Sequence, residues 1–298
     1  MNHQGARTND PLPARLPACP PDGWAVEPDA PDAAAYAALA GDRAWNGYSI
    51  ADLEPPFRAH ARFALARRGD AADTPPGAAC LFLRHPAFSA IIPHGEAAGL
   101  AAILAHDSAA GALPPAAFLL ARDEHLPAIE ALYDFPGGRQ EMARLAVDAA
   151  AFHPPAGLVP APQRLGPADL PALLDLYAAY PDNAFNDDQL ASGPFYGFRD
   201  SERLVAAGGT HVVAARYGIA AVGNVYTRPD FRGRGYGAAV TAAVVADLLA
   251  AGCGDVILNV GVANSAARHL YARLGFREHC RYWEGRVRLK VGGLAVQG

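Results

Sequence analysis

The stretch "RPDFRGRGYGAAV", residues 228–240, decides how this sequence is interpreted, because glycines and arginines alternate just before a run of helix-forming residues. The preceding segment "IAAVGNVYT", residues 219–227, has the composition of a β-strand. The following segment "AAVTAAVVADLLAAG", residues 238–252, has apolar residues at helical spacing. The order is therefore a strand, a glycine-rich turn and a helix.

Such a turn is suited to binding phosphate. The first turn of a helix presents N–H groups without partners and a partial positive charge. Gly233, Gly235 and Gly237 let the backbone approach a ligand closely and adopt positive φ, so successive N–H groups can surround an anion. Arg232 and Arg234 add positive charge. The alternative is a flexible turn that carries arginines.

Neither of two common nucleotide-binding motifs fits this loop. A dinucleotide-binding motif requires G-x-G-x-x-G with an acidic residue about 20 positions on, and the last spacing here is wrong. A P-loop requires Gly-Lys followed by Ser or Thr, which is absent here.

Two motifs in order resemble the GCN5-related N-acetyltransferase (GNAT) superfamily. The first, R/Q-x-x-G-x-G/A, is matched by Arg232, Gly235 and Gly237. The second, N-x-x-A-x-x-L-Y-x-x-L-G-F, is matched by "NSAARHLYARLGF", residues 264–276. The resemblance is clear over roughly residues 200–285. It implies an α/β GNAT fold in the C-terminal half, with a central, mostly antiparallel sheet flanked by helices.

The resemblance also implies an acetyl-CoA site. Loop amides would hold the pyrophosphate, and the strand ending at Thr227 would pair with the pantetheine arm. The predicted cofactor-binding residues are Val225, Tyr226, Thr227, Arg232, Gly233, Arg234, Gly235, Tyr236, Gly237, Asn264 and Ala267.

Acetyl transfer from a thioester to an amine needs proton transfers, and two residues are predicted to be catalytic. Tyr271 matches the family position that donates a proton to the leaving thiolate, although it also belongs to an apolar helical stripe that could simply pack. Many relatives use a glutamate as base on the strand before the loop. Residues 203–228 contain no Asp or Glu, and His211 is the only side chain there that titrates near neutral pH. The alternative for His211 is a solvent-facing strand residue.

An aromatic and acidic connection, residues 180–198, lies where the family builds its acceptor pocket. Carboxylates and aromatic rings together suit a cationic amine. The predicted substrate-binding residues are Asp182, Phe185, Tyr196 and Asn224. The alternative for residues 180–198 is an ordinary acidic surface loop, and the alternative for Asn224, on the strand that precedes the glycine loop, is a polar residue at a strand end.

Proline-rich segments divide the chain. We expect a flexible tail at 1–22, a smaller mixed α/β domain at 23–158 and the acetyltransferase domain at 159–298, with the boundary in the proline-rich stretch 152–171. The first domain resembles the degenerate half of two-domain GNAT members in size and mixed pattern only. An unrelated accessory domain is the alternative. Within the second domain, "RLVAAGG", "THVVAARYG" and "IAAVGNVYT" predict three strands joined by glycine turns.

Composition restricts the possible partners. Apolar residues make up 51% of the chain and charged residues 18%, which predicts a packed core, and the net charge of -5 argues against nucleic-acid binding. Four dispersed cysteines share no metal-ligand spacing, so no metal is expected. No apolar run approaches the ~18 residues of a membrane span, and the N-terminus has no secretory pattern. We expect a cytoplasmic monomer or homodimer.

These observations predict an N-acetyltransferase that moves an acetyl group from acetyl-CoA to an amine of a small molecule or peptide. Direct attack in a ternary complex is expected, because no cysteine is placed for a covalent intermediate. The alternative is a non-catalytic acyl-CoA-binding sensor. The sequence leaves the acceptor and the acyl-chain length open.

Overall fold

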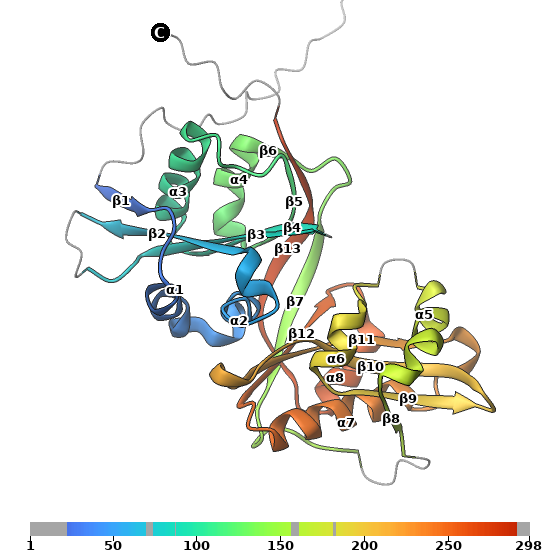
Figure 1. The fold of residues 1–298 in the computed structure, drawn as a ribbon. Helices are drawn as coiled ribbons and strands as arrows, with labels where there is room; N and C mark the ends of the chain where they lie inside the picture. The colour runs from blue at the N-terminus through green and yellow to red at the C-terminus, as the bar shows by residue number, and fades with distance from the viewer. Residues whose placement is uncertain (1–22, 70–73, 87, 156–160, 181–182, 291–298) are drawn as a thin grey trace, which may run out of the picture.

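The computed structural model describes residues 23–69, 74–86, 88–155, 161–180 and 183–290. These residues form one 13-stranded sheet with helices on both faces (Figure 1). The strand order is β1-β2-β3-β4-β5-β13-β7-β12-β11-β10-β9-β8, and β6 pairs with β13 at the side.

The elements of the first half are β1 (Trp24–Glu27), α1 (Asp32–Leu39), α2 (Arg43–Ala51), β2 (Ala61–Arg68), β3 (Ala78–His85), β4 (Phe88–Gly95), α3 (Ala97–Ala109), β5 (Ala116–Ala121), α4 (Leu126–Leu132), β6 (Tyr133–Asp134) and β7 (Gln140–Val147). The elements of the second half are β8 (Gln163–Leu165), α5 (Leu170–Ala178), α6 (Asp187–Ser192), β9 (Phe195–Asp200), β10 (Arg203–Ala214), β11 (Ile219–Thr227), α7 (Tyr236–Ala250), β12 (Asp255–Gly261), α8 (Ser265–Arg273) and β13 (Arg277–Leu289).

The same order of elements occurs twice. In each half, three antiparallel strands (β2-β3-β4 and β9-β10-β11) lead into a helix (α3 and α7). The next strand, β5 or β12, lies parallel to the third one. A further helix and a long strand complete each half. The first half therefore repeats the architecture of the second.

The two halves exchange their last long strands. β7, at the end of the first half, pairs with β12 of the second half. β13, at the end of the second half, pairs with β5 of the first half. β7 and β13 also pair with each other, and they run side by side between the two lobes (Figure 1). The boundary predicted near residue 158 stays a prediction. β7, which precedes this position, pairs with β12 of the second half, and β13, which follows it, pairs with β5 of the first half.

The middle of the sheet is buried on both faces. In β12, Val256 and Leu258 pack with α7 in one core cluster. On the other face Ile257 lies under α2, where a Cβ on Gly47 would come 2.5 Å from its Cδ1 atom. A helix of the first half thus covers the sheet of the second half, and Gly47 permits this close approach.

Two predictions from glycine and loop patterns are wrong. The glycine pattern predicts a turn at Gly208 and Gly209, but both lie inside the continuous strand β10. A Cβ on Gly209 would come 2.3 Å from the Phe195 ring, so this glycine makes room for an aromatic side chain. The connection predicted at 180–198 contains helix α6 and strand β9. An Asn186 capping box begins α6, with its side chain accepting from the Gln189 amide.

Among the described residues, no helix is both long enough and apolar enough to span a membrane.

Candidate functional site

A gap opens in the sheet between β11 and β12. The two strands pair in parallel from Ile219 to Val222 against Asp255 to Leu258, and β11 then continues to Thr227 without a partner on that side. β12 continues to Gly261 and pairs only with β7 there. The strands therefore diverge, and one edge of β11 is left with free backbone groups.

A bulge in β11 begins at the point of divergence. Gly223 lies opposite Gly209 of β10, but Tyr226 lies opposite Ala207, so β11 has an extra residue between them. Asn224, inside the bulge, has a φ of 55°, which is unusual for a residue other than glycine. The extra residue turns the end of β11 away from β12.

Buried hydrogen bonds hold Asn224 in this conformation. The Asn224 Nδ2 atom donates to Gln189 Oε1 at 2.9 Å. The Tyr177 hydroxyl donates to the backbone carbonyl of Asn224 at 2.5 Å. Asn224 is 7% exposed. Its predicted substrate role stays a prediction, but these contacts make it a residue that shapes the bulge.

The backbone groups of Val225 and Thr227 face the gap. The Arg228 amide donates to Val205 of β10 at 2.9 Å. Because backbone groups alternate between the two edges of a strand, those of Tyr226 also point to β10, and those of Val225 and Thr227 point away from it. The Thr227 carbonyl accepts a hydrogen bond from Arg232 Nε at 3.1 Å. The backbone groups of Val225 and Thr227 thus face the gap and those of Tyr226 do not; contact of any of the three with a cofactor stays a prediction.

The glycine loop leads from β11 into the 15-residue helix α7. Gly233 and Gly235 have φ of 77° and 80°, a region that side chains other than glycine rarely adopt. Gly235 is the N-cap, and no side chain caps the helix. A Cβ on Gly233 would have no neighbour within 4 Å, so open space adjoins this backbone. The arrangement leaves the first amides of α7 available to an anion.

The side chains around the loop have different surroundings. Arg232 and Arg234 are exposed. Tyr236 stacks on Phe198, with ring centroids 4.4 Å apart. A Cβ on Gly237 would come 3.2 Å from Leu270 of α8. Gly237 therefore allows α7 and α8 to pack closely. The two exposed arginines donate to backbone carbonyls of the loop region, Arg232 to Thr227 at 3.1 Å and Arg234 to Asp230 at 3.2 Å.

Tyr271 lies at the inner face of α8. Its ring is buried and packs edge-on against Phe276 at 5.8 Å. Burial is the main cause that raises the pKa of the Tyr271 phenol, and the nearby Tyr180 phenol adds to the rise. Tyr180 stacks on Tyr226 of β11, so Tyr271 is close to the β11 side of the gap. No described residue forms a hydrogen bond with its hydroxyl.

Asn264 has a structural function at the start of α8. Its side chain accepts a hydrogen bond from the Ala267 amide at 3.1 Å and so caps the helix. Asn264 is exposed and Ala267 is half-buried. Contact of either residue with a cofactor stays a prediction.

His211 is held between the two halves. The Tyr48 hydroxyl, on α2, lies 3.1 Å from His211 Nδ1. A Cβ on Gly223 would come 2.2 Å from the His211 ring, so the ring lies directly over the bulged strand. Burial lowers the pKa of His211 to about 4, and the Asn224 side chain opposes this effect. His211 is thus half-buried and neutral at pH 7, and its catalytic role stays a prediction.

Of the predicted acceptor residues, Phe185 and Asn224 both contact Tyr177, whereas Tyr196 lies elsewhere. Phe185 packs on Tyr177 and Phe195 in the core cluster beneath α5. Tyr196 donates to Asp247 near the end of α7, several turns from the glycine loop. Asp182 lies outside the described residues. Packing explains both aromatic side chains, and their substrate role stays a prediction.

Sequence reasoning missed Tyr48, Tyr177 and Gln189. Tyr48 comes from the first half, and no local motif surrounds it. The Asn186–Gln189 capping box was readable in "NDDQ", residues 186–189, but its link to Asn224 was not.

Comparison with known proteins agrees with this geometry. Residues 166–276 match the acetyltransferase (GNAT) family. This stretch, which includes the glycine loop and the motif of α8, is therefore similar to a GNAT domain. The resemblance predicted from the two motifs is therefore confirmed.

A mycothiol acetyltransferase of Renibacterium salmoninarum is 32% identical over 156 residues, which are 51% of this chain and 41% of that relative. The match thus spans about two fifths of the relative's length.

Solved structures resemble nearly the whole chain. A GCN5-related N-acetyltransferase from Sphaerobacter thermophilus is 16% identical, with a TM-score of 0.57, and the match covers 91% of this chain and 98% of that one. A tandem GNAT protein from the clavulanic acid biosynthesis pathway is 12% identical, with a TM-score of 0.54, and the match covers 89% and 98%. The predicted mixed α/β GNAT fold is confirmed.

Proposed function

We propose that this protein transfers an acetyl group from acetyl-CoA to an amine of a small molecule or peptide. The observation that carries the proposal is the gap between β11 and β12, which has the glycine loop beyond the end of β11 and Tyr271 near its β11 side. The family match supports acetyl transfer in general, as does the name of the Renibacterium salmoninarum relative.

In this proposal the cofactor lies in the gap. The amides at the start of α7 bind the pyrophosphate, with Arg232 and Arg234 as counter-charges. The free edge of β11 pairs with the pantetheine arm through Val225 and Thr227. Tyr236 and Gly237 shape the loop and its packing on α8.

The chemistry is a direct attack of the amine on the thioester. Tyr271 is protonated at neutral pH, as a phenol of ordinary pKa also is, so it has a proton to donate to the departing thiolate. His211 is the candidate base, but a pKa of about 4 makes it a weak one. Only about one in a thousand amines of pKa ~10 is neutral at pH 7. We therefore expect the rate to rise with pH.

Cofactor binding tests the proposal. Acetyl-CoA at 100 times its Kd stabilises a protein by about 2.7 kcal/mol, so it should raise the melting temperature. Gly235→Val should abolish this shift, because valine resists the φ of 80° and occupies space beside the helix N-terminus.

Gly254→Val is the matched control, since a Cβ there has open space and φ lies outside the left-handed region. Unchanged melting of the wild type in millimolar acetyl-CoA would refute the proposal. Binding without thiol release across a panel of amines would favour the acyl-CoA sensor instead.

A further inference from the structure

Helix α2 of the first half covers the point where β11 and β12 diverge. The last paired residues of the two strands are Val222 and Leu258. Gly223 and Asn259 follow them and therefore stand on either side of the opening. Asn259 lies on the same face of β12 as Ile257, because one residue separates them, and Ile257 lies under α2. The start of the gap thus faces the first half of the chain.

The His211 ring lies over the start of the gap. A Cβ on Gly223 would come 2.2 Å from both Cδ2 and Nε2 of this ring, so the ring edge that carries Nε2 lies against the strand. The other ring nitrogen, Nδ1, lies 3.1 Å from the hydroxyl of Tyr48 on α2. The ring therefore bonds to the first half through Nδ1 and places Nε2 at the start of the gap.

His211 Nε2 is accessible to a proton donor. Among the described residues it has no hydrogen-bond partner, and it is not one of the inaccessible atoms without a partner. Asn224 Oδ1, by contrast, is such an atom. Burial lowers the pKa of His211, and the Asn224 side chain opposes this effect, because an acceptor beside the ring stabilises its protonated form. A proton taken up at Nε2 therefore finds an acceptor in Asn224.

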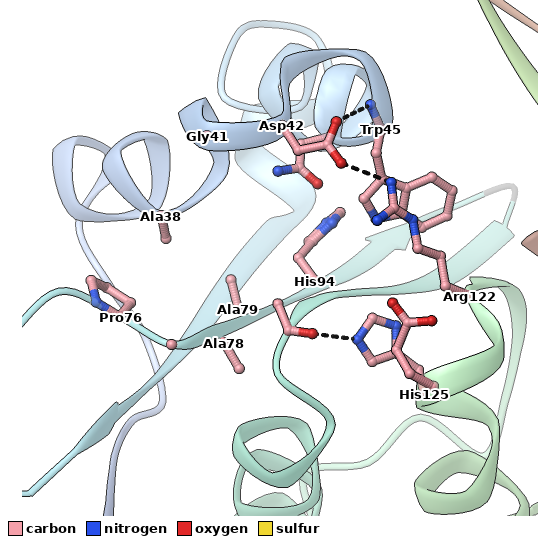
Figure 2. A pocket seen from close by; sticks show the side chains of 14 residues that line it. Ala38, Gly41, Asp42, Trp45, Pro76, Ala78, Ala79, His94, Arg122 and His125 are labelled. Carbon is pink, nitrogen blue, oxygen red and sulfur yellow. Dashed lines mark hydrogen bonds and ion pairs between the residues drawn. The ribbon is translucent and has the colours of Figure 1, made fainter. Parts of the chain in front are cut away.

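The first half contains a similar bond to a histidine that is not accessible. Ser49, next to Tyr48 on α2, has its hydroxyl oxygen 2.8 Å from His94 Nε2. Figure 2 shows His94 beside a pocket of about 250 Å³. His94 is only 3% exposed, however, and its Nδ1 atom is inaccessible and has no partner in the described part of the chain. Of the two histidines that α2 holds in this way, His211 is the one placed for proton transfer.

Tyr48 is a neutral phenol at physiological pH. Burial raises its pKa to about 12; the Arg144 guanidinium opposes this rise, and the carboxylates of Glu284 and Asp52 add to it. The central guanidinium carbon of Arg144 lies 4.7 Å from the centre of the Tyr48 ring, so the ring is held between α2 and β7. The oxygen of a neutral hydroxyl accepts hydrogen bonds as well as donating one, and it is therefore suited to accept from Nδ1–H of a histidine.

Tyr271 lies on the opposite face of the sheet from α2. It belongs to the core cluster that Val256 and Leu258 form with α7, whereas Ile257 points to α2. His211 bonds to α2 and therefore lies on the other face from Tyr271. The two predicted catalytic side chains thus flank the gap from its two faces.

We infer that Tyr48 is a positioning residue of the acetyl-transfer site, so that the first half completes the site of the second. Its hydroxyl oxygen accepts a hydrogen bond from Nδ1–H of His211, which leaves Nε2 as the proton acceptor. This inference rests on the proposed function. Nε2 takes the proton that the amine nitrogen loses as this nitrogen bonds to the acetyl carbon. The C–S bond breaks, and the departing thiolate takes the proton of Tyr271.

Steady-state thiol release by the full chain, with acetyl-CoA and a panel of amines, tests the role of Tyr48. Tyr48→Phe should lower kcat by about 10- to 100-fold, a part of what a positioned base contributes. The KM for acetyl-CoA should change by less than about twofold, because removal of uniform binding is not involved.

Tyr36→Phe is the matched control. The Tyr36 hydroxyl accepts a hydrogen bond from Arg43 Nη1 at 3.0 Å, and its ring stacks on Tyr217 of the second half at 4.7 Å. Tyr217 precedes the start of β11, at the far end of this strand from the gap. Tyr36→Phe therefore also removes a hydroxyl between the halves, but it should keep the wild-type kcat.

A double variant shows whether Tyr48 acts through His211. Tyr48→Phe combined with His211→Asn should be no slower than His211→Asn alone, because two residues that act as one unit do not have additive effects. Losses that multiply in the double variant would overturn the inference. A kcat within about threefold of the wild type in Tyr48→Phe or in His211→Asn, with chemistry rate-limiting, would overturn it as well.

Nitrogen NMR of the His211 ring tests the tautomer without turnover, with the signals assigned by their absence in His211→Asn. At neutral pH the wild type should carry the ring hydrogen on Nδ1, Tyr36→Phe should do the same, and Tyr48→Phe should move it to Nε2. A hydrogen on Nε2 in the wild type, or the same tautomer in Tyr48→Phe, would overturn the inference. If no amine of the panel releases thiol, the proposed function fails, and these signals still decide whether Tyr48 positions His211.

Discussion

The substitution Tyr271→Phe removes one hydroxyl group and so distinguishes a catalytic role of Tyr271 from a purely structural role in the core. The phenylalanine ring keeps the contact with Phe276. No described residue bonds to the Tyr271 hydroxyl, so its removal leaves no buried group without a partner. We expect a change in unfolding free energy of less than ~0.5 kcal/mol. Positioned proton transfer contributes about 10²- to 10⁴-fold, so kcat should fall by that factor.

Tyr133→Phe is the matched control. The Tyr133 hydroxyl donates to the Pro114 carbonyl at 3.0 Å in the first half, and both groups are buried. Loss of this bond should cost about 1–3 kcal/mol of stability and leave kcat unchanged. We therefore expect opposite results for the two variants: Tyr271→Phe should lower kcat and leave stability unchanged, and Tyr133→Phe should lower stability and leave kcat unchanged.

The assay follows thiol release from acetyl-CoA under steady-state conditions, with urea unfolding and an acetyl-CoA titration on each variant. Affinity for acetyl-CoA should stay nearly the same in Tyr271→Phe, because in the proposed site the cofactor is held by backbone amides that this substitution does not touch. A kcat within about threefold of the wild type, with chemistry shown to be rate-limiting, would refute the role of Tyr271.

Two further predictions concern stability. Asn264→Ala should lower the unfolding free energy by about 1 kcal/mol through loss of the α8 cap. Asn264→Asp should keep most of this stability, because aspartate also caps helices. Equal stability of the wild type and both variants in urea unfolding would exclude the capping role. The pKa of His211 is lowered to about 4 from an ordinary 6.5, so the unfolded chain takes up the proton first as pH falls. The stability advantage of the wild type over His211→Asn should therefore shrink between pH 6.5 and pH 4, by about 3 kcal/mol; a constant difference in urea midpoints across this range would contradict the burial of this ring.

The glycine loop and α8 could be predicted because their signals are contiguous in sequence. Gly233, Gly235 and Gly237 sit within one turn, and Tyr271 lies inside a single helical motif. A local motif also restricts local geometry: the glycines permit the positive φ that Gly235 has, and a helix cap at Asn264 or Ser265 is expected, of which Asn264 is the one observed.

The remainder of the site depends on contacts between distant segments. Tyr48 reaches His211 from α2, and no sequence period links these two positions. Gly209 has the same composition signal as a turn glycine, although here it accommodates the Phe195 ring. Glycine marks either a turn or a close approach, and only the neighbouring strand decides which.

The exchange of β7 and β13 has a consequence for any attempt to isolate the GNAT domain. A fragment of residues 161–298 contains the matched family region but lacks β7, so β12 would have a free edge along Val256–Val260 and β13 would lose its partners on both sides.

Such apolar edges without partners promote aggregation, and the absence of α2 would also expose Ile257. We expect this fragment to be insoluble or unfolded alone and to become soluble when co-expressed with residues 1–155, as judged by gel filtration and circular dichroism. A monodisperse, folded fragment that binds acetyl-CoA like the full chain would show that the halves are independent domains and that the exchanged strands contribute little to the stability of either.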